Sequence, residues 1–221
     1  MTDMTRWQEL FAAKAKTLYP ADDVSHDVLH IDRVVKTALQ LAQAEGADIR
    51  VVMPAAYFHD FVNVPKDDPR RKMASRLSAD AAVAYLREVG YPEEQLPAIH
   101  HAIAAHSFSA NIAPETIEAK VVQDADRLDA LGAFGIARCF SVSTLLKRPY
   151  YNGDDAWAEA RPLDDGCFAV DHFPVKLFKI AGTMQTDTAR LEAKRRADFM
   201  KSYLEQMKTE ISGDFSSGVA A

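Results

Sequence analysis

Apolar residues recur at intervals of three and four positions along most of the chain, which is the spacing of one face of an α-helix. No stretch alternates apolar and polar residues as a half-buried strand does. The pattern therefore predicts an all-α fold. The expected helices cover residues 7–18, 26–45, 49–60, 78–89, 94–105, 114–131, 169–180 and 187–209.

Residues with special backbone preferences mark where these helices begin and end. Ser25 is expected to cap the N-terminus of the second helix, because its hydroxyl can accept a hydrogen bond from an unpaired backbone N–H. Gly46 should close that helix, since glycine readily adopts the left-handed conformation found at helix C-termini. Pro54 is expected in the first turn of the third helix, where a missing N–H does no harm.

The length of 221 residues suits a single domain, which we place at residues 1–211. Residues 147–168 mix proline, glycine and acidic side chains, and they form the expected lid or excursion from the helices. Residues 212–221 are small and polar, which predicts a flexible tail.

Composition and charge narrow the class of protein. The net charge of −6 argues against a general nucleic-acid-binding surface. Cys139 and Cys167 form no close-spaced pair, so reduced thiols in a cytoplasmic protein are expected. The polar N-terminus lacks the apolar core of a secretory leader, and no apolar run reaches the length of a membrane span. We therefore expect a cytoplasmic monomer or homodimer with no membrane contact.

Three short segments carry residue types that bind metal ions in proteins. They are His26-Asp27-x-x-His30, the adjacent pair His59-Asp60, and the acidic run Asp124-Ala125-Asp126-Arg127-Leu128-Asp129. Two neutral imidazoles and two carboxylates would cancel the charge of a divalent cation, with Mn, Mg, Co, Ni, Fe or Zn as candidates. Carboxylates set among apolar helices need a partner, and a cation is the simplest one.

The helical spacing favours one histidine as a ligand but leaves the choice among the three aspartates open. His26 and His30 share a helix face, and His30, which lies deeper in the helix, is the preferred ligand. His26 would then face the substrate. Asp126 and Asp129 share a face while Asp124 points elsewhere, so one of the three should reach the ion and the others should support it or face solvent. Packed histidines and a solvated acidic face are the plain alternatives.

Together these segments resemble the HD-domain superfamily of metal-dependent phosphohydrolases. The resemblance covers residues 20–205 and rests on His26-Asp27-x-x-His30-x-x-Arg33-Val34, His59-Asp60, the segment from Val122 to Arg138, and Asp171-His172-Phe173-x-x-Lys176-Leu177. These motifs are similar to those of a bacterial branch of small nucleotide pyrophosphohydrolase-like and uncharacterised proteins. The resemblance implies a helical bundle with its metal site between central helices. The ligands it implies are His30, His59, Asp60 and Asp126.

Basic and histidine side chains near these segments are candidates for binding phosphate or moving protons. Lys66 follows the His-Asp pair in a basic loop and is a candidate for both roles. A solvated loop is its plain alternative. The other phosphate candidates are Arg127 and Lys176. The other catalytic candidates are His26, Asp124 and His106, with His106 as the proton donor to a leaving group.

The predicted function is hydrolysis of a small phosphorylated molecule at a divalent metal ion. If the branch resemblance extends to the substrate, a nucleoside triphosphate is cleaved to the monophosphate and pyrophosphate. The alternative is a nucleoside monophosphate phosphatase. A di-metal oxygenase and a nucleotide-binding module without turnover are two further alternatives, and His101 or His106 is the candidate for completing a second metal site.

Overall fold

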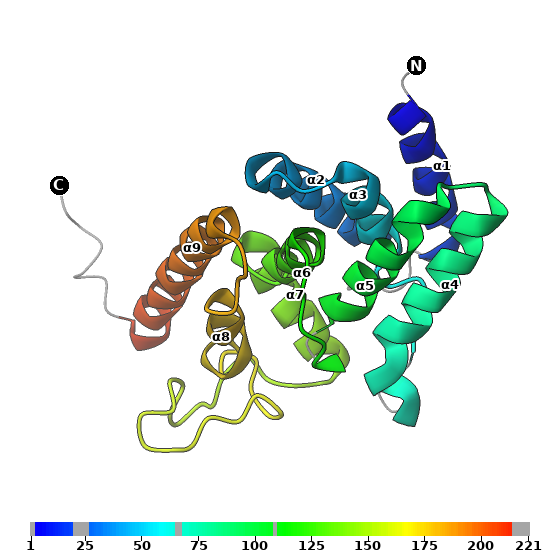
Figure 1. Cartoon of the computed structure of the whole chain (residues 1–221). Helices are drawn as coiled ribbons and strands as arrows, with labels where there is room; N and C mark the ends of the chain where they lie inside the picture. The colour runs from blue at the N-terminus through cyan, green and yellow to red at the C-terminus, as the bar shows by residue number, and fades with distance from the viewer. Residues whose placement is uncertain (1–2, 20–26, 65–67, 108–109, 214–221) are drawn as a thin grey trace. The chain divides into compact units, whose positions relative to one another are not determined.

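The computed structural model describes residues 3–19, 27–64, 68–107 and 110–213, and every regular element in these ranges is a helix (Figure 1). The predicted all-α class is confirmed. The chain divides into two compact units. Unit 1 comprises residues 1–129 and 184–189, and unit 2 comprises residues 130–183 and 190–221. The predicted single domain over residues 1–211 stays a prediction.

Unit 1 carries most of the helices. They are α1 (Asp3–Leu18), α2 (Val28–Glu45), α3 (Ile49–Phe58), η1 (Pro69–Met73), α4 (Ala74–Glu88), η2 (Glu93–Gln95), α5 (Leu96–His106) and α6 (Ile117–Asp129). Helix α3 is buried from Val51 to Phe58 and contacts α1, α2, α5 and α6. A helix that is apolar on all sides belongs inside a bundle. The C-terminal end of α3 is therefore held by neighbours on several sides.

Aromatic packing attaches α1 to this central helix. Phe11 is fully buried, and its ring centroid lies 5.1 Å from that of Phe58 in an edge-on arrangement. Trp7 stacks on Phe11 at 5.8 Å and meets Tyr91 at 4.9 Å. Edge-on and offset rings add attraction beyond the burial of their surface. The middle of α1 is thus fixed against α3.

The N-cap of α2 differs from the prediction. Asp27, and not Ser25, occupies the cap position, and its carboxylate accepts a hydrogen bond from the backbone N–H of His30 at 2.8 Å. An aspartate satisfies the unpaired N–H groups of a first turn as well as a serine does and adds a favourable charge. Gly46 closes α2 with a φ of +71°, as predicted.

Pro54 lies inside α3 and not in its first turn, so that prediction is wrong. A proline cannot donate to the carbonyl four residues earlier, which here belongs to Arg50. The Tyr91 hydroxyl donates to that carbonyl at 2.6 Å. A side chain distant in sequence therefore replaces the missing helical hydrogen bond and makes the proline tolerable.

Two other predicted helices begin or break differently. Helix α4 begins at Ala74, four residues before the expected start, and it buries Ser75 and Ser78. The expected helix over residues 169–180 is turns followed by a π-helix, η4 (Phe173–Leu177), and the short helix α8 (Phe178–Ala181). Pro174 lies at the start of η4, where it removes a backbone donor and prevents a continuous helix.

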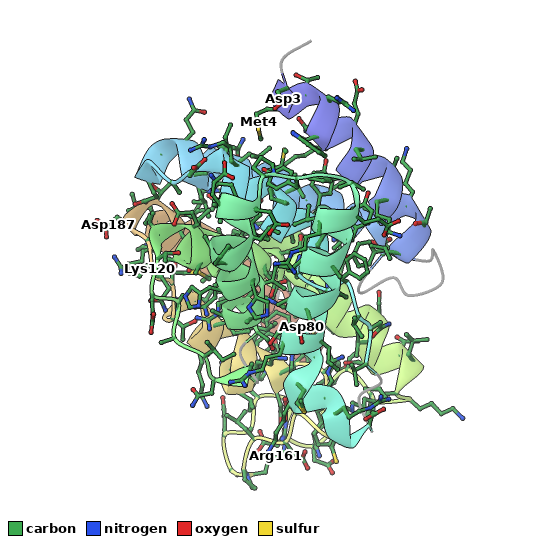
Figure 2. The ribbon with its side chains drawn as sticks, turned by 45° about the vertical axis from the view of Figure 1, so that its right-hand side comes forward. Asp3, Met4, Asp80, Lys120, Arg161 and Asp187 are labelled. Atoms are coloured by element: carbon green, nitrogen blue, oxygen red, sulfur yellow. The ribbon has the colours of Figure 1, made fainter. Side chains whose placement is uncertain are left out.

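Unit 2 contains α7 (Gly132–Leu145), η4, α8 and most of α9 (Asp187–Ser212). Small residues at the start of α7 allow the backbone to pack closely. A Cβ on Gly135 would lie 2.2 Å from the Ala130 carbonyl oxygen. Residues 147–168 form no helix or strand. Arg161, labelled in Figure 2, forms two hydrogen bonds from this segment to the buried Asp171. The lid stays a prediction.

The predicted flexible tail over residues 212–221 falls mostly outside the described residues, and Ser212 is the last residue of α9. No single helix in the described part of the chain is long and apolar enough to cross a membrane, although α6 and α7 pass the same test of length and composition when taken together.

Candidate metal centre

His30 lies in the first turn of α2, where the Asp27 cap fixes its backbone. Its side chain is 1 % exposed. The Nδ1 atom lies 2.7 Å from an Asp129 carboxylate oxygen. The Nε2 atom lies 3.4 Å from Nε2 of His59 and 3.6 Å from Oδ1 of Asp126. The two ring nitrogens of His30 thus meet two carboxylates from α6.

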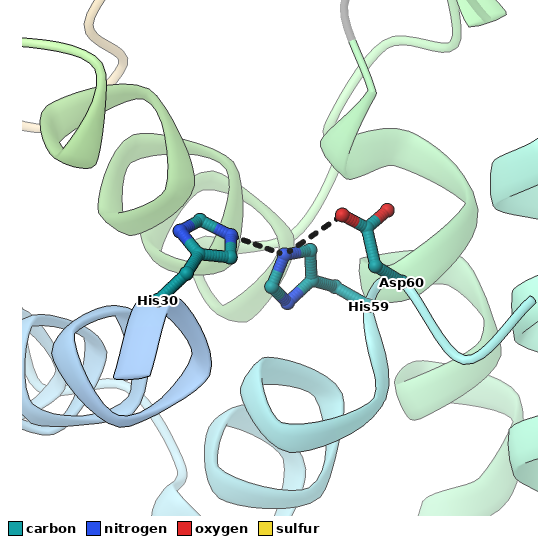
Figure 3. A group of neighbouring side chains, drawn as sticks. All are labelled: His30, His59 and Asp60. Atoms are coloured by element: carbon teal, nitrogen blue, oxygen red, sulfur yellow. Dashed lines mark hydrogen bonds and ion pairs between the residues drawn. The ribbon is translucent and has the colours of Figure 1, made fainter. Parts of the chain in front are cut away.

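His59 and Asp60 lie in the turn that ends α3. The helix expected over residues 49–60 ends at Phe58, so both residues follow its last turn. Nδ1 of His59 donates to the Ala56 carbonyl at 2.9 Å. Nε2 of His59 lies 3.6 Å from Oδ2 of Asp60 and 3.8 Å from Oδ1 of Asp126. Figure 3 shows His30, His59 and Asp60 directed toward one another.

The protonation pattern makes this cluster suitable for a cation. Nδ1 of His59 faces a carbonyl and Nδ1 of His30 faces a carboxylate, so each Nδ1 carries the proton of the neutral ring. Both Nε2 atoms then present lone pairs to each other and to the carboxylate of Asp60. Burial lowers the pKa of His59 and outweighs the negative charges of Asp60 and Asp126, which raise this pKa. Protonation of the ring therefore does not readily relieve the repulsion between the two lone pairs.

The ligand atoms of His30, His59 and Asp60 all lie within 4.8 Å of one another. A divalent ion would attract every one of these lone pairs, and imidazole nitrogen with carboxylate oxygen is a common ligand set for such ions. The residues present therefore fit a metal ion. Asp126 is 29 % exposed and its Oδ1 faces both imidazoles, which makes it the candidate fourth ligand.

Asp129 and Arg33 support His30 from behind. The Arg33 guanidinium donates to both carboxylate oxygens of Asp129, at 2.7 and 3.0 Å. Burial raises the pKa of Asp129, but the hydrogen bonds from His30 and Arg33 outweigh it and hold this pKa well below its ordinary value. Asp129 therefore stays ionised and orients the His30 ring. Carboxylates that bind a ligand histidine in this way set both its tautomer and its direction.

The acidic run separates by helix face as expected. Asp126 and Asp129 face His30, while Asp124 turns toward the start of α9. The fully buried Asp124 carboxylate accepts hydrogen bonds from the backbone N–H groups of Gln185 and Thr186 and from the Thr186 hydroxyl, at 2.8–2.9 Å. These contacts assign Asp124 to holding the segment before α9, and its catalytic role stays a prediction.

We expect Asp124→Asn to destabilise the protein and to leave its metal site largely intact. The amide loses the charge that stabilises three donated hydrogen bonds, which should cost about 1.5–3 kcal/mol in free energy of unfolding. Chemical denaturation would measure this loss, and calorimetric titration with a divalent ion would measure affinity. A metal affinity reduced as strongly as by removal of Asp126 would contradict the assignment.

His106 is the histidine of α5 that lies near the cluster. Its Nδ1 donates to the Ile103 carbonyl at 2.6 Å, and its Nε2 lies 3.6 Å from Oδ1 of Asp60. Burial lowers the pKa of His106, but the hydrogen bond to Asp60 and the charges of Asp60 and Asp126 raise it further, so the net direction is upward. The Nε2 atom of His106 is thereby placed beside the ligand turn.

The other histidines of α5 have different partners. Nε2 of His100 lies 2.9 Å from Oδ1 of Asp80 on α4. Figure 2 labels Asp80. His101 accepts a hydrogen bond from the backbone N–H of Glu115. Of the two residues considered for a second metal site, the structure brings His106 to the cluster and gives the His101 ring a different partner.

Four further predicted residues keep roles that the structure does not test. His26 and Lys66 belong to the ranges that the structure does not describe. Arg127 is half-buried on α6, where burial lowers the pKa of its guanidinium against the charges of Asp124 and Asp126. Lys176 is an exposed residue of η4 in unit 2. The phosphate roles of these residues stay predictions.

Sequence reasoning assigned no role to Arg33 or Asp27 and no specific role to Asp129. A signal for Arg33 was available, because it follows His30 by three residues and so shares its helix face. Asp129 has the same spacing from Asp126. What the sequence could not show is that α2 and α6 lie side by side, which places these pairs against each other.

Comparison with known proteins identifies the family. The family model of the HD domain matches residues 28–131. The uncharacterised protein YpgQ of Bacillus subtilis is 36 % identical over 192 residues, covering 85 % of each chain. The crystal structure of YpgQ in complex with ADP superposes with a TM-score of 0.74 at 32 % identity, over 93 % of this chain and 95 % of that one.

A second solved structure has the same fold over nearly its whole length. It is an HD-superfamily hydrolase from Bacillus thuringiensis, with a TM-score of 0.73 at 32 % identity, over 93 % of this chain and 97 % of that one. The matched residues 28–131 include His30, His59, Asp60 and Asp126. With the order and the convergence of these residues, the comparisons show that this chain belongs to the HD-domain superfamily, in a group of bacterial proteins similar to YpgQ.

Proposed function

We propose that this protein is a metal-dependent phosphohydrolase that cleaves a nucleoside triphosphate to the monophosphate and pyrophosphate. The observation that carries the proposal is the convergence of the His30 and His59 Nε2 lone pairs with the carboxylate of Asp60. Such a cluster is unfavourable without a cation. The chain that carries this cluster belongs to a family that includes a protein described as an HD-superfamily hydrolase.

His30, His59, Asp60 and Asp126 would hold the ion. When bound, a divalent ion lowers the pKa of water and stabilises charge on phosphoryl oxygens. In the proposed reaction the water oxygen bonds to the α-phosphorus, the bond from that phosphorus to the bridging oxygen breaks, and pyrophosphate leaves. Two carboxylates and two neutral imidazoles keep the protein's own charge at this point balanced against a divalent ion.

His106 is the proposed proton donor. The contact with Asp60 places its Nε2 close to the ligand turn, and the raised pKa of the ring favours the protonated form that a donor needs. The Ile103 carbonyl holds the opposite ring nitrogen, so the ring cannot turn that proton away without losing a buried hydrogen bond. Proton transfer to the departing oxygen is the general-acid role proposed for it.

The relative YpgQ supports a nucleotide as the substrate class, because that protein has been crystallised in complex with ADP. ADP carries a phosphoanhydride, which favours cleavage of a polyphosphate over release of phosphate from a monophosphate. Lys66, Arg127 and Lys176 are proposed to bind phosphate oxygens. Lysine and arginine stabilise such oxygens through charge-assisted hydrogen bonds.

A product assay tests the proposal. Purified protein would be freed of metal, reloaded with Mn, Mg, Co, Ni, Fe or Zn, and incubated with nucleoside tri-, di- and monophosphates. We expect pyrophosphate and monophosphate in equal amounts from a triphosphate, and no product after metal removal. Phosphate release from monophosphates alone would establish the phosphatase alternative, and no turnover with any bound ion would contradict an enzymatic function.

A further inference from the structure

The turn that carries His59 and Asp60 must hold two adjacent residues with their ligand atoms close together. Backbone carbonyls in the last turn of a helix have no helical partner and need another donor. Here His59 Nδ1 donates to the Ala56 carbonyl, and the backbone N–H of Phe61 donates to the Phe58 carbonyl at 3.1 Å. The carbonyl between them, on Tyr57, has a side-chain donor from a distant part of the chain.

Tyr19 provides that donor. Its hydroxyl donates to the Tyr57 carbonyl at 3.0 Å, across 38 residues of sequence. Tyr19 follows α1 directly, its own N–H donates to the Ala15 carbonyl, and its side chain is only 6 % exposed. The tyrosine is therefore a rigid extension of α1 that reaches the end of α3.

The same hydroxyl also meets Asp60. Burial and the negative charge of the Asp60 carboxylate raise the pKa of Tyr19, while a hydrogen bond with the Asp60 backbone lowers it. A phenolic hydroxyl can donate one hydrogen bond and accept another. The Tyr19 oxygen thus contacts the backbone before and after His59, at the carbonyl of Tyr57 and at Asp60.

We propose that Tyr19 is a positioning residue for the metal site, which holds the His59-Asp60 turn in the conformation that brings both ligands to one ion. The inference rests on the proposed metal-dependent function. Without the hydroxyl, a buried carbonyl and the backbone of Asp60 would both need new partners. The turn would shift to find such partners, and this shift would displace both His59 and Asp60 from the ion.

Helix α3 contains a matched control at its other end. Tyr91 also lies almost fully buried and donates its hydroxyl to a carbonyl of α3, that of Arg50, at 2.6 Å. Removing this hydroxyl takes away the same kind of hydrogen bond from the same helix, about two and a half turns before the ligands. Tyr91→Phe therefore measures the structural part of the effect alone.

The experiment compares Tyr19→Phe, Tyr91→Phe and the unaltered full chain. Calorimetric titration with Mn²⁺ would measure affinity, electron paramagnetic resonance of the bound Mn²⁺ would report ligand geometry, and thermal unfolding of metal-free protein would measure stability. We expect both variants to unfold at lower temperature. Only Tyr19→Phe should weaken Mn²⁺ binding, by on the order of 10–100-fold, the range for residues that orient metal ligands, and change the resonance spectrum.

Equal Mn²⁺ affinities for the two variants would overturn the proposal. An unaltered chain that binds no divalent ion would instead overturn the proposed function, and with it this inference. If Tyr19→Phe does not fold, amide hydrogen exchange of the unaltered protein decides. The backbone N–H of Asp60 should exchange as slowly as amides inside α3, and fast exchange would contradict the role given to Tyr19.

Discussion

Asp60→Asn is expected to lower affinity for divalent ions by more than about 100-fold and to abolish turnover. Replacing residues that only orient metal ligands already costs about 10–100-fold, so loss of a direct ligand should exceed that range. The amide keeps the size of the carboxylate but contributes no charge to balance the ion. Titration of metal-free protein with Mn²⁺ would measure affinity, and product release would measure turnover on the same preparation.

Asp80→Asn is the matched control for this prediction. Asp80 is 70 % exposed on α4, and its contact is with the half-exposed His100. Its loss should change the free energy of unfolding by no more than about 0.5 kcal/mol, as for most exposed pairs. Circular dichroism should show unchanged helix content in both variants. Full metal affinity in Asp60→Asn would remove Asp60 from the ligand set.

Asp129→Asn should have the second largest effect, because it alters both the metal site and stability. The asparagine oxygen can still accept from His30, but it cannot hold the Arg33 guanidinium with two charged oxygens. We expect metal affinity to fall by about 10–100-fold. The free energy of unfolding should fall by about 1.5–3 kcal/mol, the range for hydrogen bonds to charged groups.

Arg33→Gln separates the two parts of this effect. It removes the guanidinium but leaves the contact of Asp129 with His30, so metal affinity should fall less than in Asp129→Asn. Calorimetric titration and urea denaturation of both variants would establish the order. If Asp129→Asn bound Mn²⁺ as tightly as the unaltered chain does, the orientation of His30 would not depend on this carboxylate.

The sequence by itself determined the class of fold and the order of the ligand candidates. Helical spacing of apolar residues is a local property, so it predicted α1, α2 and α9 within a few residues of their observed ends. The same 3.6-residue period predicted that Asp126 and Asp129 share a face and that Asp124 does not. Family motifs then placed the four ligand candidates.

Two local details were not predicted correctly from residue types alone. Pro54 is tolerated inside α3 because Tyr91 reaches the carbonyl that the proline leaves unpaired. The cap of α2 belongs to Asp27, although Ser25 is an equally reasonable candidate by residue type. The first case depends on a hydrogen bond between residues 41 positions apart, and the second on a choice between two good cap residues that lie two positions apart.

Only the tertiary structure decided what lies around each ligand. Periodicity places residues on one face of one helix, but it carries no information about which helices meet. The packing of α2 against α6 sets Asp129 and Arg33 behind His30, and the packing of α1 against α3 brings Tyr19 to the His59-Asp60 turn. Hydrogen bonds and charge interactions act over a few ångströms in space and are independent of sequence separation. The sequence therefore determines which residue types can bind the ion, while the tertiary structure determines how they are oriented.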